Sequence, residues 1–290
     1  MSIFANKNTK VLIQGITGTQ ASFHVKRSMD CGTNIVAGTS PKHGGQEHLG
    51  VPVFNSVKDA AKEVKFDASV LFVPAMALKN AVREAVEAEL KLVVSIADGV
   101  PVHDMLEIRA MLKGTKTVMI GPNTPGLITP GEARLGIFPE NIHKKGCIGI
   151  ISRASTLTYE AVIETNLAGL GQSTVIGLGD DVIVGTDFRR PIKEFMEDKE
   201  TKALVLVGKS DSLYEQMAAE YYKGLKNKKP IIAFIAGESL PFEKSSGYAN
   251  DILTRGRITV HDKKKLMENA GIIVVDSVNQ IHNALTELKL

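Results

Sequence analysis

An α/β fold with two doubly wound domains is predicted for this chain of 290 residues. Short apolar runs rich in β-branched residues alternate with longer mixed segments. A stretch rich in Gly and Pro interrupts the alternation near residues 125–145, and the pattern then starts again. Alternating strands and helices are typical of parallel sheets covered by helices. The length is sufficient for two domains with full cores.

Five runs in the first half are interpreted as buried strands, because each is continuous, apolar and bounded by Gly or Pro. These runs cover residues 10–16, 34–40, 68–74, 90–97 and 116–122. The stretches 56–64 and 77–90 between them have helical character. The first domain is therefore expected at residues 1–125, followed by a linker at 126–145.

The same alternation predicts the second domain at residues 146–290. Its strands are expected at 147–152, 172–179, 202–209, 229–237 and 271–277. The repetition concerns the architecture only, since no sequence repeat accompanies it. Lysine runs at 226–229 and 262–268 lie beside acidic residues or helix ends, and they are interpreted as solvated helix ends.

Composition restricts the class of protein. Hydrophobic residues make up 43% and charged residues 23%, which is typical of a globular protein in water. A net charge of +3 is too small to indicate a nucleic-acid partner. No run approaches the roughly 18 apolar residues of a membrane span, and the N-terminus lacks the apolar core of a signal peptide. Cys31 and Cys147 lack metal-ligand spacing. We expect a cytoplasmic protein without a metal site, nucleic-acid partner or membrane contact.

The loop after the first predicted strand contains small residues at regular spacing. Gly15, Gly18 and Ala21 form the pattern G-x-x-G-x-x-A. Small residues allow a tight turn, and the following helix presents free N–H groups to an anion. A plain strand-to-helix turn can need glycine as well, so this pattern by itself leaves both interpretations open.

Four other predicted strand ends carry small or polar residues, at 39–45, 73–76, 97–101 and 121–126. Ligands of open parallel sheets bind at the carboxyl ends of the strands. Lys42 and His43 could contact phosphates there, and Asp98 could accept a hydrogen bond from a ligand amide or hydroxyl. The pattern favours a ligand that resembles a phosphate-bearing mononucleotide.

Long motifs across nearly the whole chain resemble the α subunits of succinyl-CoA synthetase, also called succinate–CoA ligase. These motifs are "NTKVLIQGITGTQASFH", "HLGVPVFNSVKDA", "IGPNTPGLITPGE", "STLTYEAV" and "IAG". The superfamily also includes malate–CoA ligases and ATP citrate lyase. The resemblance implies an N-terminal Rossmann-like CoA-binding domain and a C-terminal flavodoxin-like domain. It also implies a ligase subunit of the tricarboxylic acid cycle that works with a β-type ATP-grasp partner, which would bind ATP or GTP with Mg.

The resemblance also implies site residues. The family binds CoA at positions that match Thr17, Gly18, Thr19, Gln20, Ile96, Ala97 and Asp98. A CoA-contacting lysine lies in the family pattern Pro-Gly-Lys-Gly-Gly, where this chain has Pro41-Lys42-His43-Gly44-Gly45. The lysine has thus moved by one position, and His43 takes its place. Tyr159 matches the tyrosine at the site of the small carboxylic acid.

A tyrosine occupies the position of the family's phosphorylated histidine. The stretch "SGYAN" resembles the family's Gly-His-Ala-Gly, with Tyr248 in place of histidine. Neutral imidazole is nucleophilic near pH 7. A phenol, with a pKa of about 10, is a poor nucleophile and a poor leaving group. We therefore expect that Tyr248 is not phosphorylated during turnover.

Three further departures accompany that tyrosine. The family's glutamate, which orients the histidine, matches Lys209, and two family glycines match Ser155 and Asp180. Asp180 beside Asp181 adds negative charge where a phosphoryl group would lie, and like charge opposes anion binding. We expect Lys209 to meet these aspartates or an anionic acid substrate. His261, the nearest histidine in sequence, is interpreted as the start of a surface helix.

Three functions remain open from the sequence. The first is the α-type subunit of an NDP-forming acid–CoA ligase, which forms or cleaves an acyl-CoA thioester without the usual histidine relay or with a histidine of the partner. The second is a non-catalytic subunit that binds CoA or acyl-CoA. The third is an acyl or carbamoyl transferase on the same scaffold. The sequence identifies neither the acid nor the nucleotide.

Overall fold

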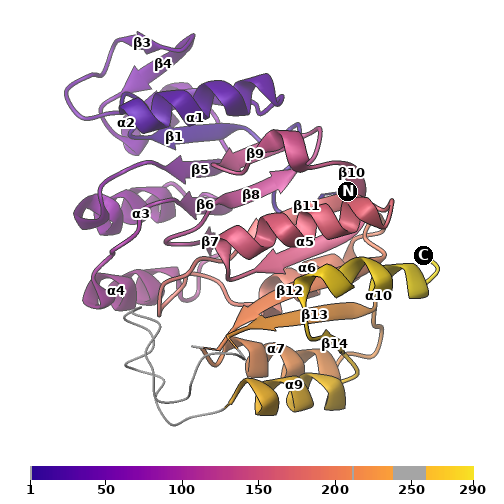
Figure 1. Cartoon of the computed structure of the whole chain (residues 1–290). Helices are drawn as coiled ribbons and strands as arrows, with labels where there is room; N and C mark the ends of the chain where they lie inside the picture. Colours follow the sequence, from indigo (N-terminus) through magenta and orange to yellow (C-terminus); the bar gives the residue numbers. More distant parts are fainter. Residues whose placement is uncertain (1, 211, 238–258) are drawn as a thin grey trace. The chain divides into compact units, whose positions relative to one another are not determined.

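The computed structural model describes residues 2–210, 212–237 and 259–290 of the chain, and Figure 1 traces them. They form two compact units. The N-terminal unit comprises Phe4–Glu140 and Leu178–Thr186, whereas the C-terminal unit consists mainly of Asn141–Gly177 and Asp187–Leu290. A short segment of the second half of the chain therefore belongs to the N-terminal unit.

The N-terminal unit contains a seven-stranded sheet with the order β3-β4-β2-β1-β5-β6-β7. Its neighbouring strands run parallel, except for the antiparallel pair of β3 and β4. Without the two-residue β3, this is the order 3-2-1-4-5-6 of Rossmann folds, so the predicted fold of this unit is confirmed. The strands are β1 (Val11–Gln14), β2 (Ile35–Thr39), β3 (Glu47–His48), β4 (Val51–Phe54), β5 (Ala68–Leu71), β6 (Leu92–Ser95) and β7 (Val118–Ile120).

Helices cover this sheet through apolar faces. In α3, Leu78, Ala81, Val82 and Ala85 are buried, and their spacing places them on one side of the helix. They form one cluster with strand residues such as Leu71. The helices of this unit are α1 (Thr19–Asp30), α2 (Val57–Glu63), η1 (Ala75–Ala77), α3 (Leu78–Glu87) and α4 (Val102–Leu112).

Two strands lie within residues 126–145, which the sequence suggested to be a linker. β8 (Gly126–Thr129) and β9 (Ala133–Gly136) pair in an antiparallel hairpin. Gly126 and Gly136 lie opposite each other. A Cβ atom on Gly126 would lie 2.0 Å from the carbonyl oxygen of Leu135, and one on Gly136 would lie 2.3 Å from that of Pro125. The glycines that resemble a linker in the sequence therefore permit a close approach of two strands.

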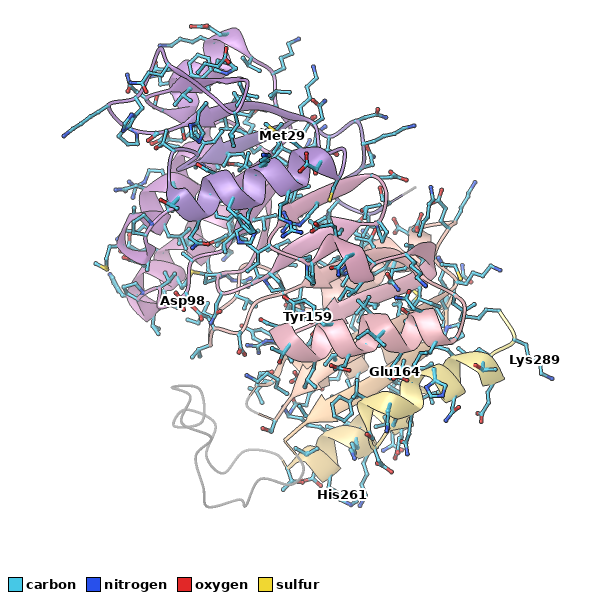
Figure 2. All side chains as sticks on the ribbon, turned by 45° about the horizontal axis from the view of Figure 1, so that its top comes forward. Met29, Asp98, Tyr159, Glu164, His261 and Lys289 are labelled. Atoms are coloured by element: carbon cyan, nitrogen blue, oxygen red, sulfur yellow. The ribbon has the colours of Figure 1, made fainter. Side chains whose placement is uncertain are left out.

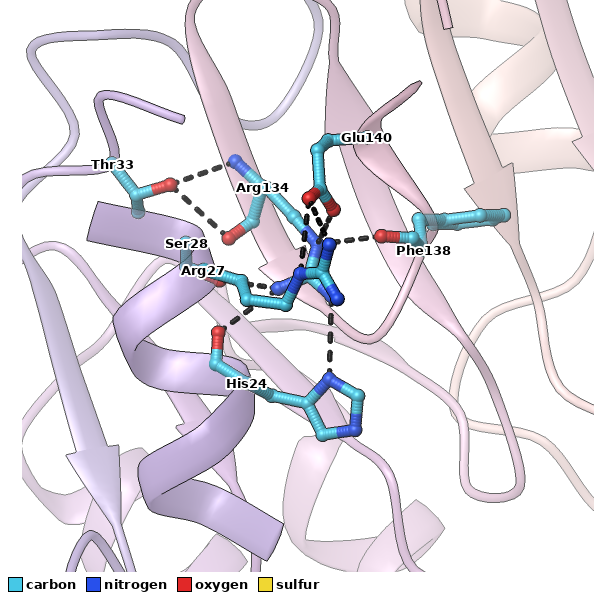
Figure 3. Close-up of polar contacts among 7 residues, drawn as sticks. All are labelled: His24, Arg27, Ser28, Thr33, Arg134, Phe138 and Glu140. Carbon is cyan, nitrogen blue, oxygen red and sulfur yellow. Dashed lines mark hydrogen bonds and ion pairs between the residues drawn. The ribbon is translucent and has the colours of Figure 1, made fainter. Parts of the chain in front are cut away.

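A buried arginine anchors this hairpin to α1 (Figure 3). The Arg134 side chain is only 2% exposed, and its Nε donates to the carbonyl oxygen of Phe138 at 2.5 Å. Its Nη1 donates to the carbonyl oxygen of His24 at 2.9 Å and to Ser28 Oγ at 3.0 Å. The backbone of Arg134 exchanges two further hydrogen bonds with Thr33 Oγ1. The guanidinium group thus joins α1 to the hairpin through hydrogen bonds.

His24 lies beside this guanidinium group, and both burial and nearby positive charge favour its neutral form. Arg134 Nη2 lies 3.3 Å from His24 Nδ1, which accepts a hydrogen bond only when the imidazole is neutral. Burial, together with the positive charges of Arg134 and Arg27, lowers the pKa of His24, and Glu140 offsets this only in part. Glu140 itself binds Arg27 at 2.7 Å. His24 is therefore a structural residue of this unit.

The C-terminal unit contains five parallel strands in the order β11-β10-β12-β13-β14. Numbered within the unit, this is the order 2-1-3-4-5 of flavodoxin-like folds, which confirms the predicted fold of the second domain. The strands are β10 (Lys145–Ser152), β11 (Gln172–Gly177), β12 (Ala203–Lys209), β13 (Ile231–Ala236) and β14 (Ile273–Val275).

Two groups of helices pack against this sheet (Figure 1). α5 contacts α10, and Glu164 of α5 binds His282 Nδ1 of α10 at 2.5 Å. α7 contacts both α6 and α9. The helices of this unit are α5 (Ser155–Leu167), α6 (Arg189–Glu197), α7 (Tyr214–Lys223), α9 (Val260–Asn269), η3 (Val278–Gln280) and α10 (Ile281–Glu287). η2 (Glu140–Ile142) lies where the chain passes from one unit to the other.

Candidate functional site

The turn after β1 lies at the point where the strand order of the N-terminal sheet reverses, between β1 and β5. Gly15 has a φ of 81°, and a Cβ atom there would lie 2.4 Å from the carbonyl oxygen of Phe72. Any larger residue would force the turns after β1 and β5 apart. Glycine at this position therefore lets the two turns lie close together at the switch point, which is where open α/β sheets bind ligands.

The next residues present the start of α1 to solvent. Gly18 is the N-cap of α1, and its extended backbone offers no side chain to satisfy the first N–H groups of the helix. Gly18, Thr19 and Gln20 are exposed. Thr17 Oγ1 lies 2.7 Å from Ser40 Oγ, so a hydrogen bond joins the turns after β1 and β2. An uncapped helix start at a switch point is suited to a phosphate group.

The turn after β2 carries two exposed basic residues, Lys42 and His43. Lys42 has a φ of 69°, in the left-handed region that glycine adopts without strain. The family pattern has glycine at this position, so the structure gives a physical reason for that glycine. The N–H of Gly44 donates to Asn55 Oδ1 at 3.0 Å, which fixes the end of the turn. The shifted lysine is therefore held in a conformation that is unusual for its residue type.

Ile96, Ala97 and Asp98 follow β6, the next strand beyond β5. The N–H of Ile96 donates to the carbonyl oxygen of Leu71 at 3.3 Å, and the carbonyl oxygen of Ala97 accepts from the N–H of Asn123 at 2.8 Å. Asp98 is exposed, and Figure 2 labels its side chain. The backbone of this segment is thus fixed while its carboxylate remains accessible.

The strand order places these three segments along one carboxyl edge. β2, β1, β5 and β6 are consecutive neighbours, so the turns that follow them lie side by side. The structure thereby brings the sequence-predicted CoA residues to one edge of one sheet, and we propose this edge as the CoA site. They are Thr17, Gly18, Thr19, Gln20, Lys42, His43, Ile96, Ala97 and Asp98.

Tyr159 and Lys209 flank the corresponding switch point of the C-terminal sheet, between β10 and β12. α5 begins directly after β10, and its N-cap, Ala154, provides no side-chain hydrogen bond. Tyr159 is half-buried in this helix, where Figure 2 labels it. Ser155 lies four residues earlier and shares its face of the helix. Lys209 is the last residue of β12. Both sequence-predicted residues therefore lie on elements that form the ligand-binding edge of this fold.

A buried ion pair that sequence reasoning missed lies behind Lys209. Glu215 Oε2 and Lys263 Nζ are 3.1 Å apart, with side chains 0% and 1% exposed. Burial raises the pKa of Glu215, but the charges of Lys263 and Arg153 and hydrogen bonds from Ser212 and the Lys209 N–H outweigh burial, so the pKa lies below its usual range. The carboxylate is therefore ionised and paired.

This pair corrects the interpretation of the lysine run at 262–268. Lys263 and Lys264 are buried, and only Lys265 of the three lysines is exposed. A run of charges does not reveal which members face inward, because successive residues of a helix point in different directions. Lys263 and Lys264 lie on the buried side of α9, whereas Lys265 lies on its exposed side. The interpretation of His261 is confirmed, since it is exposed in the first turn of α9 after the N-cap Thr259 (Figure 2).

Asp180 and Asp181 lie in the N-terminal unit. Asp181 Oδ1 accepts a hydrogen bond from Asn123 Nδ2 at 3.0 Å, and the N–H of Asp180 donates to the carbonyl oxygen of Asn123 at 3.0 Å. Their segment is thereby attached to the loop after β7. Lys209 belongs to the C-terminal unit, and its pairing with these aspartates stays a prediction. Tyr248 lies outside the described residues.

Comparisons with known proteins assign both units to families. Residues 6–99 match the family described as "CoA binding domain", and residues 151–284 match the family described as "CoA-ligase". The chain therefore combines the two domains of the CoA-ligase class of enzymes.

A more specific relationship follows from whole-chain similarity. The chain is 44% identical over 287 residues to the "Succinate--CoA ligase [ADP-forming] subunit alpha" of Staphylococcus epidermidis, which covers 99% of this chain and 95% of the relative. The protein of the same description from Staphylococcus aureus is also 44% identical, with the same coverage. This chain belongs to the family of succinate–CoA ligase α subunits.

Solved structures share the fold. An ATP citrate lyase from Methanosaeta concilii has a TM-score of 0.84 and 22% identity over 99% of this chain. The dinucleotide-forming acetyl-coenzyme A synthetase 1 of Ca. Korarchaeum cryptofilum has a TM-score of 0.76 and 18% identity over 95% of it. This chain spans 51% and 60% of those longer chains. Within the described ranges, every helix is too short or too polar to cross a bilayer.

Proposed function

We propose that this chain is the α-type subunit of an NDP-forming acid–CoA ligase in the cytoplasm. In this role it binds CoA and joins it to a small carboxylic acid, with succinate as the first candidate because of the named relatives. A β-type ATP-grasp partner would bind ATP or GTP with Mg. The observation that carries the proposal is the alignment of the CoA-matching residues along one edge of the N-terminal sheet.

The N-terminal edge suits the phosphates of CoA. Gly15 lets the turns after β1 and β5 lie close together, and the start of α1 offers N–H groups that its N-cap, Gly18, does not satisfy through a side chain. Lys42 and His43 add basic groups on the neighbouring turn. Asp98 can accept a hydrogen bond from an amide or hydroxyl of the ligand. When bound, CoA supplies the thiol that accepts the acyl group.

The C-terminal edge suits the acid. Tyr159 provides a hydroxyl, and Lys209 provides an ammonium group at the end of β12. A charge-assisted hydrogen bond to a carboxylate is stronger than a neutral one. In the proposed reaction, the carboxylate takes the γ-phosphoryl group from the nucleotide, and the thiolate then displaces phosphate from the acyl phosphate. The thiol proton leaves with the phosphate or passes to water.

Tyr248 changes one step of this proposed reaction. A phenol transfers a phosphoryl group poorly, because its high pKa makes it a poor nucleophile near pH 7 and a poor leaving group. The acyl phosphate would therefore react with CoA without a phosphorylated residue of this chain, or a histidine of the partner would carry the phosphoryl group. Phosphate analysis of both chains after turnover distinguishes the two routes.

Co-purification tests the proposal. The chain, expressed in its own cells with an affinity tag, is expected to bring down a β-type ATP-grasp chain. The purified complex is then screened with small carboxylic acids, CoA and ATP or GTP for thioester formation. Thioester formation that requires both chains supports the proposal. A complex that forms no thioester from any acid and nucleotide contradicts it.

A second candidate is a CoA-binding subunit without catalysis. It is favoured by Tyr248 and Lys209, which replace the histidine and glutamate that the family uses. This candidate predicts saturable CoA binding, a β-type partner and no thioester formation. An α chain in the same cells that retains the histidine would then supply the activity.

A further inference from the structure

The ion pair between Glu215 of α7 and Lys263 of α9 is completely removed from solvent, and it lies 3.1 Å apart. Burying two charges is costly, and well-packed apolar residues would hold two helices together at least as well. The pair is therefore poorly explained as a device for stability. Its other contacts indicate what it does.

All remaining hydrogen bonds of the pair reach the end of β12 and the start of α7. Glu215 Oε1 accepts from the N–H of Lys209 at 3.0 Å, and Glu215 Oε2 accepts from Ser212 Oγ at 2.5 Å. Lys263 Nζ donates to the carbonyl oxygens of Lys209 at 2.7 Å and Ser212 at 2.5 Å. An ammonium group has three protons, and these two carbonyls with Glu215 use all of them.

The pair thus holds both backbone polar groups of a single residue, Lys209. The neighbouring residue, Gly208, allows this contact, since a Cβ atom there would lie 2.6 Å from Glu215 Cγ. Lys209 ends β12 beside β10, at the edge where this fold binds ligands. A fixed backbone at that position restricts the directions in which the Lys209 side chain can extend.

We propose that Glu215 and Lys263 are positioning residues that present the Lys209 ammonium group to an anionic oxygen of the acid substrate. This inference rests on the proposed function, because it takes the acid as the ligand of the C-terminal edge. The pair acts through the backbone of Lys209 and does not touch the substrate. Removing it should therefore affect the acid and leave CoA, which binds the other unit, unaffected.

The test uses variants of the complex with its β-type partner. Glu215→Gln combined with Lys263→Met removes both charges of the pair, so neither partner is left charged and buried without the other, and this double variant is expected to fold. The matched control is Lys264→Met. Lys264 is the next residue of α9, 8% exposed in its side chain, and its Nζ binds Asp276 at 2.8 Å. Far-UV circular dichroism and thermal unfolding check the fold of each variant.

We expect the double variant to raise the KM for the acid about tenfold or more, as the loss of a hydrogen bond between charged groups does. The KM for CoA should change less than about twofold, and Lys264→Met should change neither constant beyond that. An unchanged KM for the acid, or an equal loss for CoA, would overturn the proposal.

A second background tests whether the effect passes through Lys209. Lys209→Met removes the ammonium group and keeps most of the side chain. If the pair acts through this group, adding the double variant to Lys209→Met should raise the KM for the acid by less than about twofold. An undiminished effect in that background would mean that the pair serves the fold only, and the proposal would be wrong.

Two outcomes separate this proposal from the proposed function. If the wild-type complex binds succinate or inorganic phosphate in calorimetry but forms no thioester, the ligase function fails. The positioning role is then tested by calorimetry, in which the double variant is expected to bind the same anion more weakly than the wild-type complex does. If neither probe binds, both proposals fail. Should the double variant not fold, Gly208→Ala displaces Glu215 from β12 without changing any charge and is expected to raise the same KM.

Discussion

Comparing Gly15→Ala with Gly18→Ala distinguishes an effect on the stability of the N-terminal unit from an effect on CoA binding. At Gly15 the φ of 81° disfavours any side chain, and the new Cβ would lie 2.4 Å from the carbonyl oxygen of Phe72. The left-handed backbone costs about 1–2 kcal/mol and the forced separation of two turns about 1–3 kcal/mol. We therefore expect Gly15→Ala to lower the free energy of unfolding by about 2–5 kcal/mol.

Gly18→Ala has a different expected result. Its backbone is extended, with a φ of −67°, and the nearest atoms to a new Cβ are the carbonyl oxygen of Gly15 at 3.4 Å and Ala21 Cβ at 3.8 Å. These are ordinary contacts, so the free energy of unfolding should change by about 1 kcal/mol or less. A methyl group at the helix start still obstructs a phosphate, and CoA affinity should fall about tenfold.

Two measurements decide the comparison. Urea unfolding followed by far-UV circular dichroism gives the stability of each variant, and calorimetry gives its CoA affinity. Equal stabilities of the two variants would refute the argument from the close approach at Gly15. Unchanged CoA affinity in Gly18→Ala would refute the placement of CoA at the start of α1.

Three further predictions concern the N-terminal unit. Arg134→Met leaves the carbonyl oxygens of Phe138 and His24 without their charged donor and should cost about 2–6 kcal/mol in urea unfolding, at about 1–3 kcal/mol for each group. Its control, Arg27→Met, removes a side chain 47% exposed and should cost about 1 kcal/mol or less; equal losses would contradict the anchoring role of Arg134. Lys42→Gly with His43→Lys restores the family pattern, relieves the left-handed lysine and should tighten CoA binding in calorimetry; weaker binding would show that the shifted lysine makes the contact. Because the folded protein lowers the pKa of His24, its contribution to stability is present above the ordinary pKa of about 6.5 and is lost as pH falls below that value. His24→Gln should make the thermal midpoint less dependent on pH between about 7 and 5, and an unchanged slope would exclude His24 as the titrating group.

Strands that lie in continuous apolar runs could be predicted from the sequence alone. Each of the ten predicted strands overlaps an observed one, because continuous β-branched runs between Gly and Pro have few other interpretations. β4 was missed because Pro52 interrupts a short run near the edge of the sheet. The hairpin of β8 and β9 was missed because Gly126 and Gly136, which permit its close approach, are also typical of linkers.

The candidate site was predictable only in part. Motifs identified the turns after β1, β2 and β6, and the parallel topology then required them to share an edge. The buried pair of Glu215 and Lys263 could not be predicted, since 48 residues separate its members and Lys263 lies in a run of three lysines. Only tertiary packing determines which of those lysines enters the core. The left-handed backbone conformation of Lys42 likewise could not be predicted from the sequence.

One measurement tests most directly the claim that this chain supports thioester formation without a phosphorylated residue at position 248. The complex with its β-type partner is incubated with γ-labelled ATP, the acid and CoA, and the reaction is stopped during turnover. Acyl-CoA thioester and protein-bound phosphate are then quantified in the same samples for each chain. We expect thioester to accumulate while this chain carries neither acid-labile nor acid-stable phosphate. Thioester formation accompanied by label on Tyr248 or on a histidine of this chain would contradict it.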